Sequence, residues 1–93
     1  TPTMAVAAFP VSTPPNIING QQVDKFWGAF PFTFPVNVAG LPAVSIPCGF
    51  SDEGLPIGLQ IIGNYRSETG LLNISSAFES RCEYSSQRPP GFE

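Results

Sequence analysis

The sequence contains no histidine, and Lys25 is its only lysine among 93 residues. Histidine is the most frequent general base and metal ligand in proteins, so its absence removes Ser-His and Cys-His catalysis and most zinc sites. Cys48 and Cys82 lie too far apart in sequence to form a metal-ligand pair. We expect no metal and no cofactor. We also expect two buried reduced thiols, with a bridge between them as the open alternative.

Charge is scarce as well. Charged residues make up 12% of the chain, about half the share of roughly 25% in ordinary soluble domains, and the net charge is −3. No basic run is present that would bind nucleic acid, and no apolar stretch approaches the ~20 residues that span a bilayer. Without a signal-peptide pattern, a cytoplasmic location is expected. The opening at Thr1, without an initiator Met, fits a processed chain or a fragment.

So little charge on so small a chain indicates that other protein covers part of its surface. A domain of this size has a high ratio of surface to volume and should need more charged residues, not fewer. Two explanations fit the composition equally: the chain is one piece of a larger protein, or it forms an oligomer. In isolation it is expected to associate with itself, because large exposed apolar patches attract partners.

The first 42 residues predict irregular structure with one short helix. The apolar run at 4–9 suits a buried strand or an extended segment, and 10–22 is rich in proline, asparagine and glycine and predicts a loop. Prolines interrupt the aromatic stretch at 23–34, which favours short helical turns. A helix is expected to begin near Thr33, with Pro35 in its first turn, and to end at Gly40.

Two strands with a turn between them are predicted next. Bulky and small residues alternate over 43–50 and again over 55–62, and 51–54 has turn composition. Both faces of the resulting hairpin are largely nonpolar, so we expect both to be covered, with a helix lying close to the small face. A last helix is predicted over 67–81, capped by Ser67. Its apolar stripe consists of Leu71, Ile74, Phe78 and Cys82, flanked by Leu72 and Ala77.

No residue combination in the chain predicts a catalytic centre. Ser45 lies in a strand but has no Gly-x-Ser-x-Gly surroundings, and Cys48 lacks a histidine partner. Lys25 has the neighbours of a surface loop. The pair Ser75-Ser76 falls on the last helix, where solvent-facing serines are ordinary. Activity through Ser45 or Cys48 would need a base that the sequence does not supply.

Three segments resemble the amidase signature family. Residues 32–43 match its F-T-x-P-x-N-x-x-G-x-P-A pattern, residues 54–63 match G-L-P-x-G-x-Q-x-x-G, and residues 1–3 match T-P-T. The resemblance continues through Leu71-Leu72, Phe78-Glu79 and Arg88-Pro89. It covers nearly the whole chain in the family's order and spacing.

The resemblance implies that residues 1–93 are the C-terminal segment of an amidase. The family fold is α/β, with a mixed sheet wrapped in helices. This chain is expected to supply an α+β piece of it: short strand, loop, helix, hairpin and C-terminal helix. The family hydrolyses amide carbon–nitrogen bonds with a Ser-Ser-Lys triad. That triad lies upstream of this region, so the resemblance implies that the chain carries no catalytic residue and is inactive by itself, with the rest of the parent chain as partner.

The resemblance also suggests residues near a small amide substrate. Thr3, Met4, Phe32 and Asn37 are expected to line the acyl side of the pocket, with core packing as the alternative for each. The family includes general amidases and the A subunit of the tRNA-dependent amidotransferase. The aromatic stretch at 26–31 favours the general amidases. A free-standing binding or oligomerising module without catalysis is the alternative from a different class.

Overall fold

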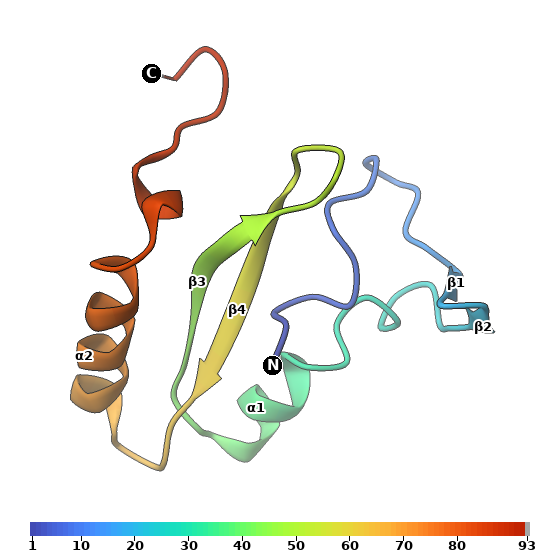
Figure 1. Ribbon diagram of the computed structural model, residues 1–93. Coiled ribbons are helices and arrows are strands. Elements are labelled where there is room, and N and C mark those ends of the chain that lie inside the picture. The colour runs from blue at the N-terminus through green and yellow to red at the C-terminus, as the bar shows by residue number, and fades with distance from the viewer. Residues whose placement is uncertain (93) are drawn as a thin grey trace.

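The computed structural model describes residues 1–92. In chain order its elements are the strands β1 (Ile17–Ile18) and β2 (Gln21–Gln22), the helix α1 (Phe34–Ala39), the strands β3 (Ala43–Phe50) and β4 (Pro56–Ile62), the helix α2 (Glu68–Glu79) and the 3-10 turn η1 (Glu83–Ser86). They form a mixed α/β piece with two separate two-stranded antiparallel sheets. The β3–β4 hairpin lies between α2 on one side and the N-terminal segments on the other (Figure 1).

The hairpin forms where the alternation predicts it. Ser45 pairs with Gln60 and Ile46 pairs with Leu59, so the bulky and small side chains of the two strands share faces. The register shifts between Pro47 and Gly49, which leaves an extra residue in β3. A bulge of this kind interrupts the regular alternation of β3 at Cys48.

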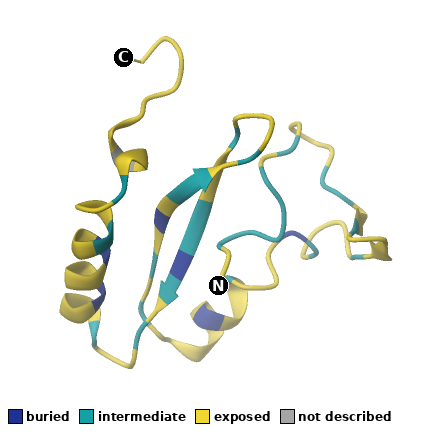
Figure 2. Ribbon diagram, in the orientation of Figure 1, coloured by how far each residue is buried: buried dark blue, intermediate teal, exposed yellow. Residues whose placement is uncertain are grey.

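The helix α2 covers the bulky face of the hairpin. Ile46 in β3 and Leu71 in α2 are both buried, and Figure 2 shows buried residues on the side of α2 that faces the hairpin. The predicted stripe is wrong at Ile74, which is 56% exposed, and at the flanking residues Leu72 and Ala77, which are exposed as well, whereas Ser75 is buried. The Ser75 hydroxyl donates to the Leu71 carbonyl at 2.7 Å, which lets a polar side chain occupy a buried position.

The short helix α1 agrees with its prediction in position and in both ends. Pro35 lies in its first turn, and Gly40 ends it with φ 68°, a left-handed conformation that glycine adopts without a Cβ clash. Thr33 and Ser67 occupy the N-cap positions of α1 and α2, but neither side chain makes a capping hydrogen bond. The Ser67 hydroxyl donates instead to the Asn64 carbonyl at 2.7 Å.

Two predictions for the N-terminal part are wrong. Residues 4–9 form no strand; the chain bends over 3–7 because the segment leaves β4 after Thr3. Residues 10–22 are not all loop, since β1 and β2 form a small hairpin around Asn19 and Gly20, both at positive φ. An Asn-Gly pair in a two-residue turn is the strongest local hairpin signal.

The chain buries few side chains completely. The buried apolar residues among those described are Ala29, Val36, Ile46 and Leu71, and none of the described side chains is less than 2% exposed. The radius of gyration is 14.9 Å, against about 12 Å for a compact chain of this length. The elements thus lie beside one another without closing around a common core.

Candidate functional site

The first three residues lie along the free edge of β4. Pro2 is paired with Leu59 in an isolated antiparallel bridge. The Thr3 amide donates to the Gly58 carbonyl at 2.9 Å, and the Gln60 amide donates to the Thr1 carbonyl at 2.7 Å. Residues 1–3 therefore continue the β3–β4 sheet by one short row. The Thr3 side chain lies beside Ser45 and Gly58 on the small face of the hairpin, the face to which the predicted helix had been assigned.

Two hydroxyl groups meet over a glycine on this small face. The Thr3 Oγ1 and Ser45 Oγ atoms are 2.6 Å apart, a hydrogen bond in which either can donate. They approach across Gly58, where a Cβ atom would lie 2.8 Å from each of the two oxygens. Real Cβ atoms essentially never come that close to another atom, so Gly58 is what allows the two side chains to meet.

A buried amide side chain connects the N-terminal row to the aromatic stretch. Gln60 is 6% exposed. Its Nε2 donates to the Thr1 hydroxyl at 3.0 Å and to the Phe32 carbonyl at 2.7 Å. Two segments that are distant in sequence thus converge on one side chain of β4.

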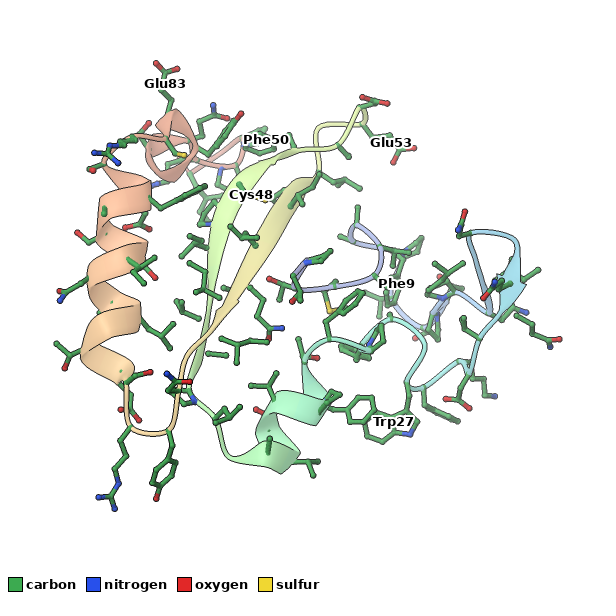
Figure 3. All side chains as sticks on the ribbon, turned by 60° about the horizontal axis from the view of Figure 1, so that its bottom comes forward. Phe9, Trp27, Cys48, Phe50, Glu53 and Glu83 are labelled. Carbon is green, nitrogen blue, oxygen red and sulfur yellow. The ribbon has the colours of Figure 1, made fainter. Side chains whose placement is uncertain are left out.

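Beside this junction is a hollow of about 890 Å³. Its wall is formed mainly by residues 2–9 and by the end of the hairpin at which the turn between β3 and β4 lies. The lining residues are Pro2, Thr3, Met4, Ala5, Val6, Ala7, Ala8, Phe9, Ile18, Phe32, Ser51, Pro56, Ile57 and Gly58. Figure 3 shows Phe9 between the hairpin and the β1–β2 region. Apolar groups dominate the wall, as in most small-molecule sites.

Three of the four predicted pocket residues lie in this wall. Thr3, Met4 and Phe32 line the hollow, whereas Asn37 is exposed on α1 and does not. The sequence did not single out the remaining wall residues from 5–9. Their signal was an apolar run of small side chains, interpreted as a strand because the bend after Thr3 leaves no mark in the sequence.

The nucleophile candidates have no base beside them in the described residues. Ser45 bonds to another hydroxyl, and the Cys48 thiol contacts the Ile57 carbonyl at 3.5 Å. The ammonium of Lys25 lies 5.2 Å from the ring centre of Phe26, at the exposed surface. Ser75, predicted to face solvent, is buried within α2. Cys48 and Cys82 are free and half-buried.

The wall can enclose an apolar group but has little with which to break a bond. The hydroxyls of Thr3 and Ser51 are its side-chain polar groups, and none of the lining residues has an ionisable side chain. Hydrolysis needs an activated nucleophile and groups that stabilise the developing charge. In the part of the chain that the structure describes, no group of three potential metal ligands occurs. None of the helices in that same part is long and apolar enough to cross a membrane.

Comparison with known proteins decides the family. The family model of amidases matches residues 1–72, more than three quarters of the chain. The chain belongs to the amidase family. The match confirms the resemblance that the signature residues of this amidase segment suggested. No solved structure matches it.

The curated relatives of this amidase segment include bacterial proteins of one kind, each named as the A subunit of glutamyl-tRNA(Gln) amidotransferase. The segment is 58% identical over 57 residues to the one from Oceanobacillus iheyensis, covering 61% of this chain and 12% of the relative. For the one from Synechococcus sp. (strain CC9902) the identity is 56% over 57 residues, with the same shares. For that of Wolbachia pipientis wMel it is 57% over 51 residues, covering 55% of this chain and 10% of the relative.

The amidase segment spans about an eighth of the length of the relatives that it matches. Their names favour the alternative of an A subunit over the general amidases to which the aromatic stretch at 26–31 pointed.

Proposed function

We propose that residues 1–93 are the C-terminal segment of an amidase-family protein of the A-subunit type, whose catalytic residues lie upstream of Thr1. In its whole form this protein breaks carbon–nitrogen bonds of amides. The observation that carries the proposal is the 58% identity to a curated A subunit, together with the family match over residues 1–72.

The surface of the chain supports its being one piece of a larger structure. The accessible surface is 7025 Å², whereas a compact monomer of 9.9 kDa should expose about 5,200 Å². The excess of about 1,800 Å² is as large as the whole area buried in a typical protein–protein interface. The proposed partner is the rest of the parent chain, which covers this surface.

The hollow beside β4 is the proposed contribution of this segment to the substrate pocket. Thr3, Met4 and Phe32 would face the acyl side of a small amide, and the apolar wall would exclude water from it. Asn37 is proposed to line the same pocket because it belongs to the signature motif at 32–43. The Ser-Ser-Lys triad that the family resemblance implies would come from the upstream part. The proposal includes a cytoplasmic location and requires no cofactor.

The test is to purify the natural protein that contains these residues and measure ammonia release. A panel of small amides that includes glutamine is offered with and without glutamyl-tRNA(Gln) and ATP, to the protein together with any subunits that copurify with it. We expect amide hydrolysis by the whole protein and none by residues 1–93 alone. If the protein is of the A-subunit type, we expect ATP-dependent transfer as well, in which ATP phosphorylates the tRNA-bound glutamyl carboxylate and the released ammonia displaces the phosphate. Hydrolysis without transfer would return the assignment to the general amidases. A natural protein that releases no ammonia from any amide would favour the binding or oligomerising module.

A further inference from the structure

We infer that Gln60 is a positioning residue that fixes the two walls of the hollow against each other. The hollow is a substrate pocket only if the proposed function is correct. The positioning role of Gln60 rests on its hydrogen bonds and is independent of that function. Gln60 is absent from the lining of the hollow and is 6% exposed. It therefore acts through the residues that it holds.

Both amide hydrogens of Gln60 are committed to different walls. One goes to the Thr1 hydroxyl and the other to the Phe32 carbonyl, partners that are 59 and 28 residues away in sequence. A main-chain bond from the Ala5 amide to the Ala29 carbonyl also connects the two neighbourhoods, but it is longer, at 3.2 Å. Losing the Gln60 side chain would thus loosen one wall from the other.

The backbone of Gln60 strengthens the same junction. Its amide donates to the Thr1 carbonyl at 2.7 Å, and the Thr1 nitrogen donates to its carbonyl at 3.0 Å. These bonds fix Thr1 at one place along β4. Because their Gln60 atoms belong to the main chain, they survive substitution of the side chain, so a variant at Gln60 isolates the link to Phe32 and to the Thr1 hydroxyl.

Only an uncharged side chain with two donors of this length fits the position. A carboxylate of the same shape offers acceptors alone and would face the Phe32 carbonyl, an acceptor too. A leucine fills a similar volume and leaves that carbonyl without its partner. Gln60→Leu therefore removes both bonds, whereas Gln60→Glu removes the bond to the Phe32 carbonyl and can still accept one from the Thr1 hydroxyl. Gln22→Leu, at an exposed glutamine in β2, is the matched control.

The deciding experiment is hydrogen exchange by mass spectrometry on the whole natural protein. In Gln60→Leu we expect roughly tenfold faster exchange in peptides covering 1–8 and 30–34, the loss expected for one or two hydrogen bonds. Peptides from α2, on the other face of the hairpin, should exchange as in the parent protein, and Gln22→Leu should change neither region. Uniformly faster exchange, or no change at 30–34, would overturn the inference.

Amide turnover supplies a second readout that a purely stabilising residue would not affect. With a small amide as substrate, Gln60→Leu and Gln60→Glu should raise KM by roughly tenfold per folded molecule and lower kcat less. Unchanged KM, with activity lost only in proportion to unfolded protein, would contradict positioning. If the protein hydrolyses no amide but exchange rises at both walls, the proposed function fails and the positioning role stands.

Discussion

The hydroxyl oxygens of Thr3 and Ser45 lie 2.6 Å apart although 42 residues separate them in sequence. Their contact ties the T-P-T row to the strand that follows the longer signature run. It depends on a third residue, Gly58, because only a position without a Cβ leaves room between the two oxygens. The motif at residues 1–3 thus contacts the strand that follows the motif at 32–43. The contact passes over Gly58, which belongs to the motif at 54–63.

Replacing Gly58 with alanine should destabilise the protein by about 1–3 kcal/mol, the range for inserting an extra carbon into a filled space. The new Cβ would stand 2.8 Å from Ser45 Oγ and Thr3 Oγ1 and 3.3 Å from Thr3 Cβ. Gly70→Ala is the matched control, since nothing lies within 4 Å of its Cβ position. Gly70 lies in the first turn of α2, so this change should stabilise by at most roughly 0.5–1 kcal/mol, the difference in a helix interior. Urea unfolding of both variants measures the difference; equal effects would refute the close contact.

The isolated 93-residue chain should associate with itself. Large apolar side chains on α2 face away from the hairpin, among them Leu72 at 64% and Ile74 at 56% exposure. Sedimentation should give a mass above 9.9 kDa, and a hydrophobic dye should bind. Leu72→Glu with Ile74→Glu should reduce both signals, whereas Val11→Glu, on an exposed loop, should do so less. A clean monomer that binds no dye would count heavily against an uncovered interface.

Neither Ser45 nor Cys48 should be the nucleophile of the whole protein. Each contacts an oxygen atom that cannot act as its base. We expect Ser45→Ala and Cys48→Ala to lower kcat less than tenfold, whereas removing a true nucleophile costs on the order of a millionfold. Steady-state kinetics on protein checked for folding provides the measurement. A collapse of kcat in either variant would place the chemistry inside this segment.

The hairpin and both helices could be predicted from the sequence because their signals are local. Alternation over 43–50 predicted the bounds of β3 as the structure has them, and Gly40 ends α1 as expected of a C-cap. The last helix is shorter at each end than the predicted 67–81, which is the ordinary uncertainty of helix ends.

The rest depended on contacts that the local sequence does not specify. The row at residues 1–3 pairs with β4 across more than fifty residues, and nothing in Thr1-Pro2-Thr3 alone predicts a strand partner. For the same reason the run at 4–9 looked like a strand. The burial of Ser75 depends on its bond to the Leu71 carbonyl, which composition cannot show.

For the candidate site, the family resemblance contributed more than the pattern of residues did. It suggested Thr3, Met4 and Phe32, which all line the same hollow although Met4 and Phe32 are 28 positions apart in the sequence. Periodicity would not have joined them. The role inferred for Gln60 came from the structure, since in the sequence it was one small-face position of a strand.

The most direct test of the central claim is the length and sequence of the natural polypeptide, from its intact mass and from the coding frame upstream of Thr1. The account predicts a chain several times longer than 93 residues, with a glycine- and serine-rich segment and a lysine upstream of Thr1. A natural polypeptide that begins close to Thr1 would contradict it, and a binding or assembly module would remain to be explained.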